Sequence, residues 1–276
     1  MKLEFTKMHG LGNDFMVVNQ VTQNVQLNTE QIRRLADRHT GVGFDQLLLV
    51  SPPSSPDADF RYRIFNADGS EVEQCGNGAR CFARFVRDKG LTHKDVIPVE
   101  TNTGRIELQL VGGDQVRVNM GPPIFDPAAI PLQAEQRQAR YKFNVGNNIV
   151  ELACLSMGNP HGVLEVSNVS NAPVRKLGPK LEAHPRFPKR ANIGFSQIVD
   201  RQHIRLRVFE RGVGETRACG TGACAAAVAA MAANRVDQRV SVTLPGGTLQ
   251  IEWRGEDQPV FMTGPATTVY DGIVRL

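Results

Sequence analysis

The sequence predicts an α+β fold of two repeated, pseudo-symmetric mixed α/β domains, with the active site in the cleft between them. Two observations lead to this fold class. The segment RIFNADGSEVEQCGNGARC, residues 63–81, resembles RVFERGVGETRACGTGACA, residues 207–225, without a gap. Both halves of the chain also combine short strand-like runs with two segments of helical length.

The repeat extends along both halves in one order. The identical pairs in the central segment are Arg63/Arg207, Phe65/Phe209, Glu71/Glu215, Cys75/Cys219, Gly76/Gly220, Gly78/Gly222 and Ala79/Ala223. Three further landmarks recur around it: Gly12-Asn13 as Gly158-Asn159, GFDQ (43–46) as GFSQ (194–197), and Gly104 with Gly121-Pro122 as Gly247 with Gly264-Pro265. Chance similarity between Gly-rich turns would not keep this order, so we expect two similar domains.

In the first half, six strands are expected from alternation and β-branching, over residues 3–5, 15–18, 47–50, 62–65, 105–110 and 115–120. One helix should begin at Asn28, with Gln31 three residues later as in a capping box and an apolar face that includes Ile32 and Leu35. A second helix is expected from about residue 77 to 90.

In the second half, Leu177 and Leu181 indicate a helix equivalent to the first, and the Ala-rich run 223–233 one equivalent to the second. Strands are expected over 240–244 and 249–253. We expect domain one to span 1–121 and domain two 122–265, with the polar stretch after Pro122-Pro123 carrying the first crossing. A last strand, 266–276, should return to complete domain one.

Composition narrows the class of protein. In 276 residues, 41% are hydrophobic and 22% charged, which is typical of an ordered globular protein. The net charge of +4 is small and evenly spread, so no nucleic-acid partner is expected. No apolar run could span a bilayer, and the charged N-terminus does not resemble a signal peptide, so the expected location is the cytoplasm.

The five cysteines are expected to be thiols in a reducing compartment. No CxxC or HxxxH spacing occurs, so no metal is expected. Cys81, Cys154 and Cys224 are interpreted as structural.

Cys75 and Cys219 carry the predicted chemistry. Each motif reads strand, loop, Cys-Gly-x-Gly-Ala, helix, which places the thiol at a helix N-terminus. There the pKa of a thiol can fall toward neutrality, and Gly-flanked N–H groups can bind a carboxylate. Two facing thiols could remove a proton from one face of a carbon and deliver one to the other. The amides would stabilise the carbanion, so no cofactor is needed.

Along its whole length, the chain resembles the diaminopimelate epimerases. The matching segments are KMHGLGNDF (7–15), GFDQ (43–46), FNADGSEVEQCGNGARC (65–81), SMGNPH (156–161), ANIGF (191–195), ERGVGET (210–216) and ACGTGAC (218–224). The resemblance implies cofactor-independent interconversion of LL- and meso-2,6-diaminopimelate, a small diamino dicarboxylate, in lysine and peptidoglycan precursor synthesis. It implies that Cys75 and Cys219 form the acid/base pair, with no metal.

The resemblance also implies further site residues. His161 and Glu210 would act near the thiols. The implied substrate contacts are Asn13, Gln46, Asn66, Gly76, Asn77, Asn159, Asn192, Glu210, Arg211, Gly220 and Thr221. The family forms homodimers, and Tyr270 matches a position in its dimer contact.

Other interpretations of these residues stay open. Asn13, Asn66 and Asn159 lie in turn-like contexts where Asn often bonds the backbone. His161 could be structural, Glu210-Arg211 an exposed charge pair, and Tyr270 part of the core.

Alternative functions also stay open. Proline racemases and hydroxyproline epimerases pair two cysteines in the same fold, but would not be expected to carry the GNDF, FNADGSE and ERGVGET segments together. Phenazine-synthesis isomerases lack the cysteine pair. A thiol redox or metal-binding protein, or a binding protein for acidic metabolites, would each leave part of the pattern unexplained.

Overall fold

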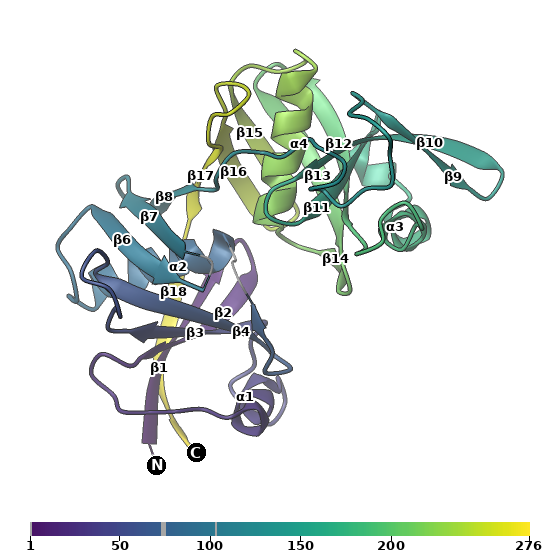
Figure 1. Cartoon of the computed structure of the whole chain (residues 1–276). Coiled ribbons are helices and arrows are strands. Elements are labelled where there is room, and N and C mark those ends of the chain that lie inside the picture. The colour runs from purple at the N-terminus through teal and green to yellow at the C-terminus, as the bar shows by residue number, and fades with distance from the viewer. Residues whose placement is uncertain (1, 73–75, 103) are drawn as a thin grey trace. The chain divides into compact units, whose positions relative to one another are not determined.

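The computed structural model describes residues 2–72, 76–102 and 104–276, which form two compact units (Figure 1). Unit 1 consists of Met1–Asn119 and Thr263–Leu276, and unit 2 of Met120–Met262. The chain therefore leaves unit 1 after Asn119 and returns to it at Thr263.

Unit 1 contains two helices and the strands around them. They are β1 (Lys2–Gly10), β2 (Asn13–Asn19), α1 (Thr29–Ala36), β3 (Gln46–Ser51), β4 (Phe60–Asn66), β5 (Glu71–Val72), α2 (Gly76–Asp88), β6 (Val96–Thr101), β7 (Gly104–Leu110), β8 (Gln115–Asn119) and β18 (Thr267–Arg275). Strand β17 (Phe261–Pro265) carries the chain back into this unit.

Unit 2 repeats this order of elements. They are β9 (Tyr141–Val145), β10 (Asn148–Ser156), β11 (Pro160–Glu165), the 3₁₀ helix η1 (Val169–Asn171), α3 (Val174–Glu182), β12 (Asn192–Asp200), β13 (His203–Glu210), β14 (Gly214–Thr216), α4 (Gly220–Ala232), β15 (Arg239–Leu244) and β16 (Gly247–Glu252).

The strand pairings of the two units agree step by step. In unit 1, β1/β2 is antiparallel, β2/β3 parallel, β3/β4 antiparallel, β4/β6 parallel and β6/β7 antiparallel. In unit 2, β10/β11, β11/β12, β12/β13, β13/β15 and β15/β16 follow the same alternation. The predicted fold class of repeated mixed α/β domains is confirmed.

The repeated Arg and Glu of the sequence motif pair in the same way in each unit. Arg63 Nε lies 2.7 Å from Glu71 Oε1 in unit 1, and Arg207 Nε lies 2.7 Å from Glu215 Oε1 in unit 2. Each ion pair joins a central strand to the short strand that follows it, across a tight turn.

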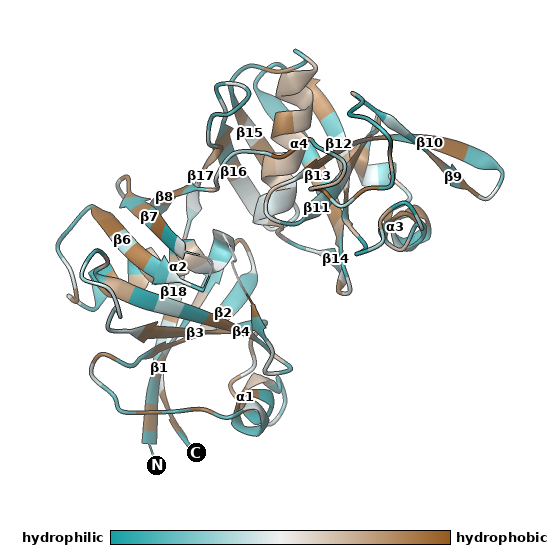
Figure 2. Ribbon diagram, in the orientation of Figure 1, coloured by the Kyte–Doolittle hydropathy of each residue, from teal (hydrophilic) through white to brown (hydrophobic). Residues whose placement is uncertain are grey.

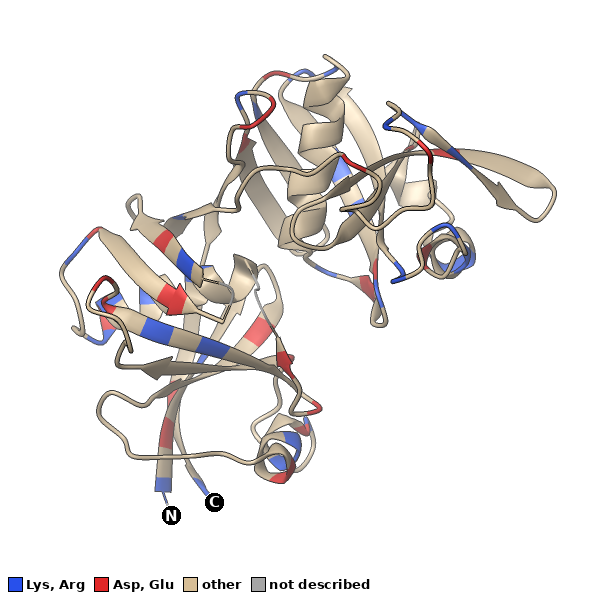
Figure 3. Ribbon diagram, in the orientation of Figure 1, with Lys and Arg blue, Asp and Glu red and all other residues tan. Residues whose placement is uncertain are grey.

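A buried helix packs against the sheet in each unit. These buried helices are α2 and α4. Helix α4 carries no charged residue, in contrast to the more exposed α1, which carries several, as Figure 3 shows. An apolar helix of this kind is stable where it is buried on all sides. A Cβ on Gly78 would lie 2.8 Å from Ile64 Cδ1, and one on Gly222 would lie 3.0 Å from Val208 Cγ2. The second glycine of each Cys-Gly-x-Gly motif therefore lets the helix approach the central strand.

Each unit has its own apolar core. In unit 1 it includes Leu3, Met16, Ile32 and Leu47, and β3 appears brown in Figure 2 because of its Leu-Leu-Leu-Val run. In unit 2 the core residues come from the 130–132 segment and β9, β10, α3 and β12: Ile130, Leu132, Tyr141, Phe143, Leu152, Val174, Leu181, Ile193 and Phe195. The polar-looking stretch after Pro123 thus contributes two core side chains to unit 2.

Strand β18 belongs to unit 1. It pairs antiparallel with β1, from Lys2 opposite Arg275 to His9 opposite Thr267. The two labelled chain ends accordingly lie side by side in Figure 1.

The predicted helix at Asn28 is also confirmed. Asn28 caps α1 through its side chain, which accepts a hydrogen bond from Gln31 N, and the Gln31 side chain bonds back to Asn28 N. Nine strands of the described residues lie outside the predicted ranges: β5, β6, β9–β14 and β17. Among the described residues, no helix is long and apolar enough to cross a membrane.

Candidate active site

Cys219 lies at the N-terminus of α4, where the motif placed it. It is the N-cap residue, with extended backbone, and only 4% of it is exposed. The Gly222 N–H donates a hydrogen bond to the sulfur, and Thr221 Oγ1 lies 3.7 Å from it. The expected helix-terminus environment is present at this thiol.

The expected lowering of the thiol pKa is wrong for Cys219. Burial raises its pKa well above the ordinary value, and the negative charge of Glu210, which also accepts a hydrogen bond from the thiol, raises it further. The bonds from Gly222 and Thr221 act in the opposite direction but are weaker. Desolvation therefore outweighs the helix N-terminus and favours the thiol form of Cys219 over the thiolate.

Glu210 is held beside this thiol by Thr216. The Thr216 hydroxyl donates a hydrogen bond to Glu210 Oε1, from the other strand of the β13–β14 pair. Thr216 thus fixes the carboxylate that accepts the hydrogen of the Cys219 thiol.

His161 joins the site through a chain of polar side chains. Its Nε2 lies 2.9 Å from Asn159 Oδ1, and Asn159 Nδ2 donates to Thr221 Oγ1 over 3.4 Å. Burial, with a smaller effect of the Arg211 charge, lowers the pKa of His161 to about 3. His161 is therefore neutral near pH 7, and its Nε2 carries the hydrogen because Asn159 Oδ1 can only accept.

Asn192 and Arg211 are the remaining residues of the hydrogen-bonded polar cluster in unit 2. Arg211 N donates to Asn192 Oδ1 over 3.0 Å, and Asn192 Nδ2 donates to Pro160 O over 3.3 Å. Asn192 also lies opposite His161 in the β11/β12 register. The structure thus brings together all predicted site residues of unit 2: Asn159, His161, Asn192, Glu210, Arg211, Cys219, Gly220 and Thr221.

The predicted residues of unit 1 form two hydrogen-bonded pairs. Asn77 Nδ2 donates to Asn13 Oδ1 over 3.2 Å, and Gln46 Nε2 donates to Asn66 Oδ1 over 3.1 Å. Gly76 is the first residue of α2. Cys75 lies outside the described residues.

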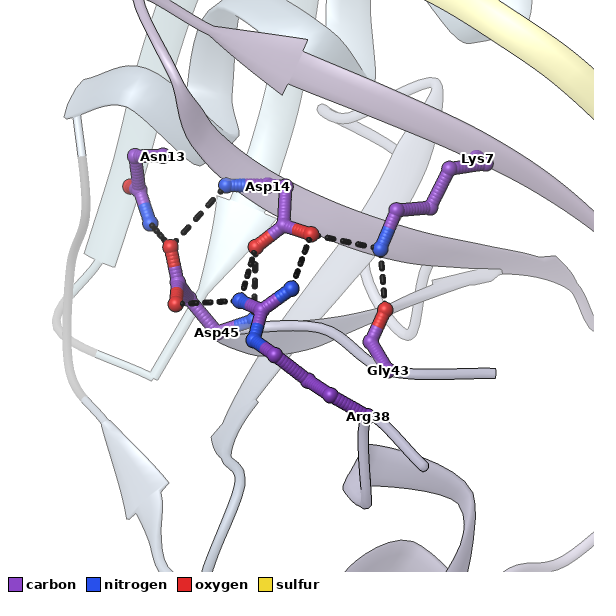
Figure 4. A network of polar contacts seen from close by, with 6 residues as sticks. All are labelled: Lys7, Asn13, Asp14, Arg38, Gly43 and Asp45. Carbon is purple, nitrogen blue, oxygen red and sulfur yellow. Dashed lines mark hydrogen bonds and ion pairs between the residues drawn. The ribbon is translucent and has the colours of Figure 1, made fainter. Parts of the chain in front are cut away.

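An ion-pair network that the sequence did not predict orients Asn13, as Figure 4 shows. Lys7 Nζ lies 2.6 Å from Asp14 Oδ2, and Arg38 Nη2 lies 2.7 Å from Asp14 Oδ1 and 2.8 Å from Asp45 Oδ1. Asp45 Oδ2 then accepts from Asn13 Nδ2 over 3.1 Å. Burial would raise the pKa of Asp14, but the bonds from Arg38 and Lys7 hold it well below its usual value.

A second residue that the sequence did not single out is Arg80, which is fully buried in α2. Its Nη2 donates to Asn77 Oδ1 over 2.9 Å, its Nη1 to Gly76 O over 3.3 Å, and its Nε to Pro265 O over 3.1 Å. Arg80 thus fixes the first turn of α2 and the amide of Asn77. Asp14, Asp45 and Arg80 all lie inside the motif segments. Their position in these segments is the sequence feature that could have indicated a role in the site.

Two other features lie away from these residues. A cavity of about 410 Å³ in unit 1 is lined by β1, β2, β18 and Phe85, and includes no predicted site residue. Across the described part of the chain, His, Cys, Asp and Glu form no group that could hold a metal ion.

The two repeated mixed α/β units, each with its own apolar core, define the fold class of this protein. Solved structures that share it include a hydroxyproline epimerase from Agrobacterium vitis, with TM-score 0.72, 16% identity and coverage of 99% of this chain and 92% of that chain. A phenazine biosynthesis protein of the PhzF family from Bacillus anthracis has TM-score 0.70 and 17% identity, with both chains fully covered.

The model of the family described as diaminopimelate epimerase matches residues 5–125 and 153–269. Relatives named diaminopimelate epimerase are 65% identical in Azotobacter vinelandii and 64% in Ectopseudomonas mendocina, each over 276 residues and 100% of both chains. The chain belongs to the diaminopimelate epimerase family.

Proposed function

We propose that this protein interconverts LL- and meso-2,6-diaminopimelate without a cofactor, by a two-cysteine acid/base mechanism, in lysine and peptidoglycan precursor synthesis. The observation that carries the proposal is the match of one family model across both repeats, each of which contains one Cys-Gly-x-Gly motif. The full-length identity to relatives of that name supports the same substrate.

In the proposed reaction, Cys219 in its thiol form delivers a proton to the α-carbon, while Cys75 as thiolate removes the α-proton from the opposite face. The two residues exchange these roles in the reverse direction. The raised pKa of Cys219 supports the thiol form for this residue. Glu210 accepts a hydrogen bond from the Cys219 thiol. Neutral His161 keeps Asn159 and Thr221 in place beside this thiol.

We propose that charged and polar side chains of the site hold the substrate. Its charged groups need partners when they leave water, and Arg211 suits a carboxylate. The amides that follow each cysteine would stabilise the carboxylate as it takes on enediolate character. We propose as substrate contacts the full predicted set: Asn13, Gln46, Asn66, Gly76, Asn77, Asn159, Asn192, Glu210, Arg211, Gly220 and Thr221.

The test is proton NMR of the purified, reduced protein with LL-diaminopimelate in D₂O, without added cofactor. Loss of the α-proton signal together with appearance of the meso isomer is the expected result. Cys75→Ala and Cys219→Ala should each stop the exchange, because neither direction can proceed with one thiol. A folded, reduced wild type that shows no exchange would contradict the proposed function, and proline-type substrates would then be tested.

We further propose that the protein is a homodimer in the cytoplasm and that Tyr270 lies in its dimer contact. Tyr270 is 46% exposed on β18 and packs edge-on against Phe5, with ring centroids 5.9 Å apart. An exposed aromatic side chain on a strand supports a contact surface.

The repeat domains are proposed to span 1–121 with 266–276, and 122–265.

A further inference from the structure

Glu182 is a buried acid with its carboxylate aimed at the turn between β13 and β14. It is the last residue of α3 and only 3% exposed. Its Oε1 accepts a hydrogen bond from Gly212 N over 2.9 Å and lies 3.3 Å from Arg190 Nη1. Its own carbonyl accepts from Ala191 N over 3.1 Å.

The turn that Glu182 holds carries two of the proposed site residues. It begins with Glu210 and Arg211, and Gly212 follows with φ of +73°, a conformation that suits glycine. Asn192 accepts from the amide of Arg211 and Glu182 from the next amide. Two successive N–H groups of the turn are therefore each held by a buried side chain.

Unit 1 holds its equivalent turn in a related way. There the turn between β4 and β5 carries Asn66, and Asp68 is the counterpart of Gly212 in the repeat. Arg33, from α1, donates through Nε to Asp68 O over 2.8 Å. In both units the first helix thus bonds the same turn position, once as donor and once as acceptor.

The burial of the Glu182 carboxylate does not by itself stabilise the folded protein. A buried carboxylate loses its hydration, and apolar residues of similar volume often replace such groups with no loss of stability. Packing therefore does not explain an acid at this position. Placement of the turn does, because a carboxylate oxygen is a strong acceptor for one backbone N–H.

We propose that Glu182 is a positioning residue that fixes Glu210 and Arg211 by accepting the hydrogen bond of Gly212. This inference rests on the proposed function, since it takes Glu210 to act at the thiol and Arg211 to bind substrate. Glu182 lies outside all the motif segments, so the site depends on a residue that the motifs do not include.

The test compares Glu182→Met, which keeps the volume but loses the acceptor, with Glu182→Gln, which keeps an acceptor oxygen. Glu151→Met, at an exposed position of β10, is the matched control. Two quantities are measured in the full-length protein: hydrogen exchange of peptides that cover residues 208–216, and the KM and kcat for LL-diaminopimelate.

Glu182→Met should speed exchange in this segment and raise KM while lowering kcat, so that kcat/KM falls about 10- to 100-fold, as expected for a misplaced site group. Glu182→Gln should stay close to wild type in both, as should the control. A purely structural role would lower the active fraction and leave KM unchanged.

Three results would overturn the inference: unchanged exchange in Glu182→Met, faster exchange with unchanged KM, or equal damage in Glu182→Gln. If Glu182→Met does not fold, Arg190→Ala removes only the cation beside the carboxylate and should leave KM near wild type. A large rise in KM for that variant would mean that the ion pair, not the bond to Gly212, is what matters. A wild type without epimerase activity would instead refute the proposed function, and the exchange data would still decide whether Glu182 holds the turn.

Discussion

At Cys219, two pairs of physical effects on the thiol oppose each other. The helix N-terminus and the Gly222 N–H favour the thiolate, whereas burial and the Glu210 carboxylate favour the thiol. The motif alone reveals the first pair of effects, since a Cys before a helix can be recognised in the sequence. The second pair depends on how completely the fold covers the sulfur and on which strand brings a carboxylate to it.

Replacing Glu210 tests this account. Glu210→Gln removes the charge that raises the pKa of Cys219, so its thiolate should form at lower pH. We expect the pH profile of Cys219 alkylation by iodoacetamide, followed by peptide mass spectrometry, to move to lower pH. Glu151→Gln, at an exposed position, should leave the profile in place. A profile that does not move, or moves to higher pH, would contradict the role of Glu210.

His161 gives a second prediction at this scale. Its pKa of about 3 in the folded protein lies below the ordinary value of 6.5, so between these values the unfolded chain binds more protons. Stability should therefore fall as the pH drops below about 6.5, by up to about 1.4 kcal/mol per pH unit from this residue. His161→Gln should show a shallower pH dependence of unfolding free energy than wild type.

The control for this experiment is His93→Gln, because His93 is exposed. That variant should keep the steep wild-type dependence. Equal slopes for wild type and His161→Gln would mean that the folded protein does not disfavour the charged imidazole.

At the scale of elements, the contact between α3 and β13 is tight at one position. A Cβ on Gly178 would come 2.7 Å from Phe209 Cγ. Gly178→Ala should thus destabilise the protein by about 1–3 kcal/mol, although alanine favours a helix, because the added methyl cannot be accommodated without a shift of the ring. Lys176→Ala, on an exposed face of the same helix, is the control, and thermal unfolding is the measurement. A stabilised Gly178→Ala protein would contradict this packing.

The elements show why some parts of the fold could be predicted. Asn28 and Gln31 form a local capping box, whose signal needs only four consecutive residues. Strand β6 was missed because Pro98 lies within it, and β11 because it begins at Pro160; proline usually argues against a strand. In β13, the alternation of Ile204, Leu206 and Val208 is a local signal that predicts a strand.

The candidate site was predictable where motif residues act alone, and less so where they act through partners. Asp14 and Asp45 stand in the motifs, but their joint hold on Arg38 depends on the pairing of distant segments. Glu182 and Arg33 lie on helices outside any motif, and only the fold brings them to the turns. Periodicity cannot reveal such tertiary partners.

At the scale of the whole molecule, unit 2 is continuous in sequence and unit 1 is not. We therefore expect a fragment of residues 120–262, which contains its own core, to fold and unfold cooperatively in circular dichroism and calorimetry. A fragment of residues 1–119 should not fold, because it lacks β18 and leaves Leu3 and Phe5 of β1 uncovered on one side. A folded 1–119 fragment would contradict this division.

The proposed homodimer can be tested at the same scale. Tyr270→Lys places a charge on the exposed face of β18 and should convert a dimer to a monomer in sedimentation velocity. Ile149→Lys, on the β9–β10 hairpin and 66% exposed in the wild type, should leave the dimer intact. A monomeric wild type, or a dimeric Tyr270→Lys protein, would exclude Tyr270 from a dimer contact.

The pairing of β1 with β18 also sets an order of events on the ribosome. During translation β1 emerges before unit 2, whereas its partner β18 follows only after all of unit 2 has been made. Unit 2 can therefore fold before unit 1 is finished, and in that interval the nascent chain presents β1 with an open hydrogen-bonding edge. That edge is the point at which a chaperone would protect the growing polypeptide, or at which two nascent chains would aggregate.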